Sequence, residues 1–166
     1  MTTTTVSEMR PTTIGLPDPT RIEMIDLLNA RLAESLDLGL QARHAHWNIR
    51  GPQFAALHDL FARFYADLDR YSDLLAERAV QLGGMAEGTV RAVGNRSSLP
   101  VYPVAIEGSE HVRCIATALT SWSGSLRRSI VPASELEDPV TADILTEISR
   151  GADKWLWQIE ACIARG

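Results

Sequence analysis

The stretch His44–His58, HAHWNIRGPQFAALH, interrupts a helical pattern and concentrates histidine. It holds three of the four histidines of a 166-residue chain, with Gly51-Pro52 between them. Apolar residues recur every three or four positions on both sides of this break, which is the period of a one-sided helix. Because two helices joined by a short turn pack antiparallel, the stretch predicts a hairpin that brings histidines from both helices to one end.

The pattern extends in both directions from the break. The helix before it is predicted to begin with Asp18 as N-cap and Pro19 at the first helical position, and to run to about Ile49. The helix after it is predicted from Phe54 to the stop at Gly83-Gly84. The residues expected to face inward from the first helix are Ile25, Leu28, Leu32, Leu36 and Leu40.

Two more helices are predicted in the second half of the chain. Residues 85–108 show no sustained period and indicate a long crossover, with room for a short helix. A third helix is predicted from a cap at Ser109 to Pro132, and a fourth from the N-cap Asp138 followed by Pro139. The expected fold is therefore all-α, a ferritin-like four-helix bundle over residues 18–166 with its crossover between the second and third helices, preceded by a flexible tail over residues 1–17.

The composition of the chain disfavours several classes of protein. A 166-residue chain that is 45% hydrophobic can bury one domain core, and its formal net charge of −5 disfavours a surface built for nucleic acid. The sequence has no apolar run long enough for a membrane span and no signal-peptide pattern at its start, so a cytoplasmic protein is expected. Cys114 and Cys162 are expected to be reduced structural thiols rather than a disulfide framework.

Helical projection separates the histidines. His46 falls on the buried stripe of its helix, whereas His44 falls off it and is expected to meet solvent. On the next helix, one ridge carries His58, Ala62, Asp69, Asp73 and Glu77. Acidic residues spaced four apart repel each other and destabilise an isolated helix by roughly 0.2 to 0.5 kcal/mol per pair. Either Arg70 and Arg78 balance a solvated acidic face, or the carboxylates and imidazoles bind a cation such as iron, manganese or zinc.

One distance restricts how such a site could form. His58 and Asp73 are fifteen residues apart, which is about 22 Å along a helix. A single metal centre cannot contact both within one chain. A two-fold dimer, in which the start of one helix lies beside the later part of its partner, would bring them together twice.

The chain closely resembles a known family. HAHWNIRGPQFAALH, DLDRYSDLLAERAVQLGG (residues 67–84) and DPVTADILTEISRGADKWLWQIEA (residues 138–161) are similar to the Dps family, the mini-ferritins named as DNA-binding proteins from starved cells. The resemblance covers about residues 21–164. It implies a homo-dodecamer with tetrahedral symmetry that oxidises ferrous iron, preferably with hydrogen peroxide, and stores ferric mineral in its cavity.

The resemblance also implies the residues of the ferroxidase centre. The metal ligands fall on His46 and His58 of one subunit and on Asp73 and Glu77 of another, with Trp47 beside the centre. Zinc or manganese are possible substitutes for iron. On the alternative reading, Trp47 is a bulky interface residue.

One position departs from the family pattern. The family usually has an aspartate four residues after the second histidine, where this chain has Ala62. We expect a tight first metal position and a weak or water-completed second one, with slower oxidation. Asp59 and Asp69 could help only through a neighbouring subunit or a water, because Asp59 is about 100° around the helix from His58 and Asp69 is too far along it.

Entry of iron is expected through three-fold pores. The family lines them with acids near the start of the last helix, and the matching residues are Asp138, Asp143 and Glu147. Ordinary helix capping and dipole chemistry is the competing interpretation for all three.

Two alternative functions remain open from the sequence. One is a nucleoid-binding protective protein with a vestigial metal site, although Arg10 is the one basic residue before position 20 and little DNA binding is expected. The other is a cage for zinc or another non-redox ion. His111 and Cys114 are interpreted as a helix-start histidine and a packed thiol rather than ligands.

Overall fold

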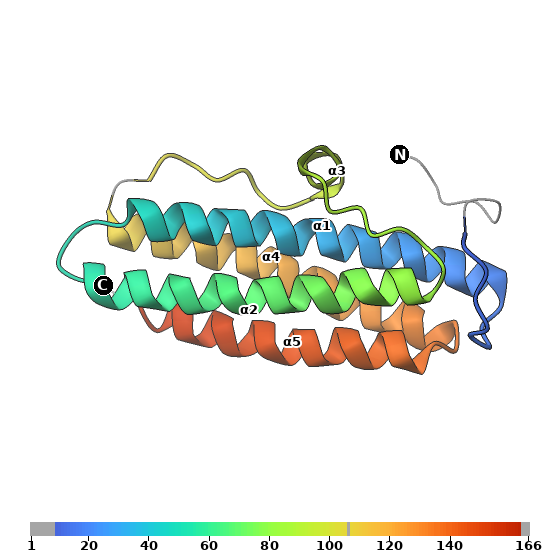
Figure 1. Cartoon of the computed structure of the whole chain (residues 1–166). Helices are drawn as coiled ribbons and strands as arrows, with labels where there is room; N and C mark the ends of the chain where they lie inside the picture. Colours follow the sequence, from blue (N-terminus) through green and yellow to red (C-terminus); the bar gives the residue numbers. More distant parts are fainter. Residues whose placement is uncertain (1–8, 106, 164–166) are drawn as a thin grey trace.

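The computed structural model describes residues 9–105 and 107–163, and over these residues it is helical without strands. Four of the helices are long and one is short. Figure 1 shows the long helices side by side in a bundle and the short one outside it. Their bounds are α1 Asp18–Asn48, α2 Phe54–Gln81, α3 Val90–Arg96, α4 Gly108–Glu135 and α5 Pro139–Glu160. The all-α, ferritin-like bundle is therefore confirmed.

The α1–α2 hairpin forms as the break in the sequence predicts. α1 ends at Asn48, and Gly51 adopts a φ of 102°, which a side chain would disfavour. Beyond this turn α2 runs antiparallel to α1 and packs closely against it (Figure 1). The core between the long helices is apolar, and its largest fully buried side chains include Phe61, Phe64 and Trp122.

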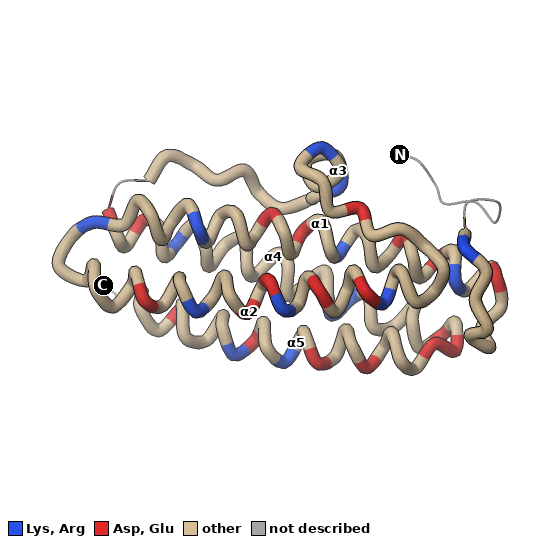
Figure 2. The backbone as a smooth tube through the Cα atoms, viewed as in Figure 1, with Lys and Arg blue, Asp and Glu red and all other residues tan. Residues whose placement is uncertain are grey.

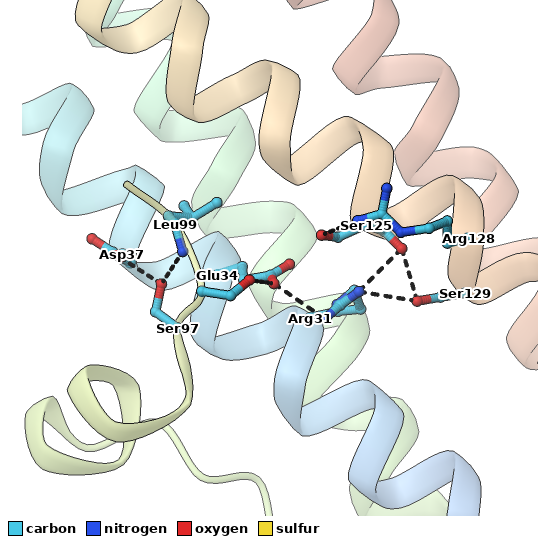
Figure 3. Close-up of polar contacts among 9 residues, drawn as sticks. Arg31, Glu34, Asp37, Ser97, Leu99, Ser125, Arg128 and Ser129 are labelled. Atoms are coloured by element: carbon cyan, nitrogen blue, oxygen red, sulfur yellow. Dashed lines mark hydrogen bonds and ion pairs between the residues drawn. The ribbon is translucent and has the colours of Figure 1, made fainter. Parts of the chain in front are cut away.

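The crossover between α2 and α4 lies along α1 and contains α3, as Figure 1 shows. A buried polar network holds it in place (Figure 3). The Ser98 hydroxyl donates to Glu34 at 2.6 Å, and Arg31 donates to the same carboxylate oxygen at 3.1 Å. Arg31 also donates to the backbone carbonyl of Ser125 on α4 at 3.1 Å. One buried cluster thus connects α1, α4 and the crossover.

Several predicted details of the helix ends are wrong. Asp18 is the first residue of α1 rather than its cap, and it pairs with Arg21. The cap of α4 is Glu107, not Ser109, because Glu107 and Glu110 satisfy each other's backbone N–H groups in a capping box. Pro132 lies inside α4, close to its C-terminal end, where it removes one intrahelical hydrogen bond without ending the helix.

One residue of the predicted inward stripe of α1 points outward. Leu40 is 56% exposed, although its helical spacing matches that of its buried neighbours. The long helix therefore has an apolar position that its own subunit leaves uncovered.

The first described residues lie against the bundle. The Arg10 backbone N–H donates to the Gly83 carbonyl at 2.8 Å, and the Arg10 side chain donates to the Val80 carbonyl. Within the predicted flexible tail, Arg10 thus binds the chain at the end of α2, and residues 1–8 lie outside the described part. None of the described helices combines the length and the apolar character needed to cross a membrane.

Candidate metal centre

The hairpin brings His46 and His58 into direct contact. Their ring centroids are 3.7 Å apart, and both side chains are half-buried. His46 Nδ1 lies 2.8 Å from the His58 backbone carbonyl oxygen, which can only accept, so Nδ1 carries a proton. This fixes the tautomer and leaves the lone pair on Nε2, which is how histidine ligands of metals are commonly held.

The predicted carboxylate ligands are elsewhere on the same subunit. Asp73 and Glu77 are exposed, and they follow His58 on an unbroken α2. Along the helix axis, His58 and Asp73 are therefore about 22 Å apart. Among the described residues, no group of three or more histidine, cysteine or acidic side chains could hold a metal ion. A single subunit brings together the imidazoles but not the acids.

The arginines that might have balanced the acidic row of α2 are bound to α5 instead. Arg78 pairs with Asp138 at 2.8 Å, and Arg70 pairs with Glu147 at 3.1 Å. Figure 2 shows acidic and basic residues interleaved along α2. The two arginines are thus paired with α5, and the exposed Asp73 and Glu77 are compatible with both interpretations of the acidic row.

The residues predicted near the centre differ in their surroundings. Trp47 is 72% exposed, and Ala62 is half-buried. Asp59 pairs with Arg63 on its own helix at 3.0 Å, whereas Asp69 pairs across the hairpin with Arg43 at 2.5 Å. Trp47 therefore leaves a large apolar surface exposed at this end of the hairpin.

Sequence reasoning missed two residues beside His46. The Tyr65 ring meets the His46 ring edge-on at 5.5 Å, and the Arg43 guanidinium lies 4.5 Å above Tyr65. These contacts depend on how α1 packs on α2. Helical spacing within one helix does not show which residues meet across the hairpin, so it singled out neither Tyr65 nor Arg43.

The three predicted pore residues are in different environments. Asp138 is 1% exposed, accepts from the Thr141 backbone N–H at 3.0 Å and pairs with Arg78. Its role as the N-cap of α5 is confirmed, and its carboxylate is not available to line a pore. Asp143 is exposed, and Glu147 is half-buried in its pair with Arg70.

The remaining histidines form a separate cluster. The Tyr102 hydroxyl lies 2.6 Å from Nδ1 of the buried His111, and His44 packs edge-on against Tyr102 at 4.9 Å. Burial lowers the pKa of His111 and raises that of Cys114. Both shifts favour uncharged groups, which agrees with the interpretation of His111 and Cys114 as packed residues.

Comparison with known proteins identifies the family of the chain. The ferritin-like domain family matches residues 25–166. The DNA protection during starvation protein of Agrobacterium fabrum is 41% identical over 147 residues, which is 88% of this chain and 91% of that protein. This chain belongs to the Dps family.

Solved Dps structures share its fold. Dps of Mycobacterium smegmatis superposes with a TM-score of 0.89 at 28% identity, covering 95% of this chain and 96% of that one. DpsA14 of Streptomyces coelicolor gives a TM-score of 0.90 at 26% identity, covering 96% and 95% of the two chains. As a Dps protein this chain is a mini-ferritin, a class of iron-storage protein.

Proposed function

We propose that this protein oxidises ferrous iron, preferably with hydrogen peroxide, and stores the ferric product as a mineral inside a dodecamer of tetrahedral symmetry. The proposed centre takes His46 and His58 from one subunit and Asp73 and Glu77 from the partner subunit. The observation that carries this proposal is the His46 tautomer, fixed by the His58 carbonyl so that Nε2 is the free ligand atom.

In this proposal iron is the substrate, and the side chains bind and orient it. The two carboxylates offset the charge of a divalent ion, while neutral imidazoles supply nitrogen ligands that suit iron. Two ferrous ions give one electron each to hydrogen peroxide, which takes up two protons and forms two waters. Consuming peroxide in this way would protect the cell from oxidative damage.

Ala62 makes the second iron position the weaker one in this scheme. The first position has His46 with Asp73 and Glu77, whereas the second keeps His58 and a bridging carboxylate. We expect anaerobic titration with ferrous iron to show one tight and one weak ion per centre, and we expect zinc or manganese to compete for the tight position.

Iron is proposed to enter through acidic three-fold pores lined by Asp143 and Glu147. Three copies of each carboxylate would concentrate cations at the pore. Asp143→Asn should slow mineral formation, and the remaining rate should depend less on salt. An unchanged rate would exclude Asp143 from the entry route.

Peroxide-dependent oxidation of ferrous iron tests the central activity. Replacing His46 with alanine should lower the rate at least about tenfold, because a ligand of the tight position is lost. His44→Ala is the matched control, since this histidine is two residues away but packs on Tyr102. The proposal fails if wild-type protein oxidises iron no faster than buffer, or if both variants behave alike.

A second candidate function is DNA protection, as the name of the Agrobacterium fabrum relative states for that protein. The net charge of −5 opposes it, because phosphate binding needs clustered cations. A gel shift that persists at about 0.15 M salt would support a DNA-bound protective role with a weakened metal site. We expect no such shift.

A further inference from the structure

The face of α2 that carries His58 also carries the residues around the proposed two-fold axis. At 100° per residue, His58, Ala62, Tyr65, Asp69 and Asp73 fall within an arc of about 80°. α2 runs without a break through all of them. A partner helix that packs along this face, close to antiparallel, therefore meets all of these residues.

The proposed shared centre sets the register of the two α2 helices. A two-fold axis that places His58 beside the partner's Asp73 makes the helices antiparallel and passes midway between these positions. The midpoint falls between Tyr65 and Ala66. Ala62 lies as far before that midpoint as Asp69 lies after it, so Ala62 faces the partner's Asp69.

We propose that the partner's Asp69 supplies a carboxylate to the second iron position, in place of the aspartate that Ala62 replaces. This inference rests on the proposed function, because that function sets the register. The Asp69 side chain is 55% exposed. The methyl group of Ala62 leaves space on the opposing helix for a carboxylate that arrives from across the axis.

Arg43 is a competitor for the Asp69 carboxylate in this scheme. It holds Asp69 of its own subunit in an ion pair at 2.5 Å and is itself stacked on Tyr65. Both charged side chains are at least one-third exposed, at 36% for Arg43, and such solvent-screened pairs are weak. An iron ion therefore competes with Arg43 for the carboxylate, and this competition lowers the affinity of the second position for iron.

The register can be tested without metal. In Ala62→Cys/Asp69→Cys protein, a short bifunctional maleimide should link the two subunits of a dimer. Ala62→Cys/Arg70→Cys is the matched control, because Arg70 is one residue further along but turned about 100° away. Linking that is absent, or equal in the two variants, overturns the proposal.

Anaerobic titration with ferrous iron tests the ligand role. Asp69→Asn should weaken the second ion about tenfold or more and leave the first unchanged, as expected for loss of one supporting carboxylate. Arg43→Gln should tighten the second ion, and adding Ala62→Asp to Asp69→Asn should restore it. An unchanged second affinity in Asp69→Asn overturns this inference while the proposed function stands. No tight ferrous ion in the wild type would instead overturn the proposed function.

Discussion

Tyr71 and Gly151 show how tightly α2 and α5 approach each other at a single position. A Cβ atom placed on Gly151 would lie 1.9 Å from the Tyr71 hydroxyl oxygen and 2.6 Å from its ring carbon Cζ. Tyr71 is 3% exposed, so its ring has no free space to move into. Gly39 on α1 differs, since the nearest atom to its added Cβ is Leu68 Cβ at 4.0 Å.

These two glycines should respond oppositely to alanine. Gly151→Ala is expected to lower the free energy of unfolding by about 1 to 3 kcal/mol through overpacking. Gly39→Ala should raise it by about 0.5 to 1 kcal/mol, because alanine favours the helix and meets ordinary contact distances. Chemical denaturation of both variants measures the difference. Equal effects would contradict the packing between α2 and α5.

Glu34 is the buried carboxylate of the network in Figure 3. Burial raises its pKa, and this effect outweighs the lowering by the Ser98 hydrogen bond and by Arg31. The folded state therefore holds the proton more strongly than the unfolded chain. Stability from the protonated form is full below the ordinary pKa of 4.5 and is lost as pH rises through the raised value.

Glu34→Gln should remove this pH dependence. The free energy of unfolding of the wild type minus that of the variant should fall as pH rises above about 4.5, and then become constant. Thermal melting of both proteins across this pH range gives the difference. If the difference rises with pH, the carboxylate is stabilised by Arg31 more than it is destabilised by burial.

At the scale of elements, a buried ion pair joins the end of α2 to the start of α5. Arg78 and Asp138 have side chains that are 6% and 1% exposed, and Asp138 also caps α5. The pair Arg70–Glu147 connects the same two helices at the surface. The two pairs have the same chemistry and differ in burial.

Arg78→Leu should therefore cost far more than Arg70→Leu. The first leaves a buried carboxylate without its partner, for which about 3 to 5 kcal/mol is typical. The second removes an exposed pair that contributes about 0 to 1 kcal/mol. Unfolding of both variants in denaturant measures the contrast, and similar losses would show that the burial of Asp138 has no energetic consequence.

The helices could be predicted from the sequence better than their ends or their contacts. Apolar spacing predicted the four long helices and left room for α3 in the crossover. It did not predict the Glu107 cap or Pro132 inside α4, because both depend on local hydrogen bonds that compete with simple stop signals.

Part of the candidate site could likewise be predicted from the sequence, and part could not. The contact of His46 with His58 followed from the hairpin, and the distance to Asp73 followed from helix geometry. The Arg43 contacts with Tyr65 and Asp69 join different helices, and so they required the structure.

At the scale of the whole molecule, large apolar side chains remain exposed near the α1–α2 turn. Leu40, Trp47 and Phe54 are 56%, 72% and 48% exposed. A partner subunit that places its Asp73 near His58 would cover this end of the hairpin. The proposed dodecamer would have a mass of about 220 kDa, twelve times that of the 18.2 kDa chain.

Leu40→Asp should weaken this assembly. A charge buried at a subunit interface without a partner is strongly unfavourable. Light scattering coupled to size-exclusion chromatography should show a mass of about 220 kDa for the wild type and smaller species for the variant. An unchanged mass would place Leu40 outside every subunit interface.

The most direct measurement of the shared centre mixes two defective subunits. One carries His46→Ala/His58→Ala and the other Asp73→Asn/Glu77→Gln, and each alone should bind no tight ferrous ion. When the two are co-expressed in equal amounts and dimerise at random, about a quarter of the centres combine intact histidines with intact acids. Anaerobic titration of the mixed cages should therefore recover about a quarter of the tight wild-type sites, whereas no recovery would contradict a centre built from two subunits.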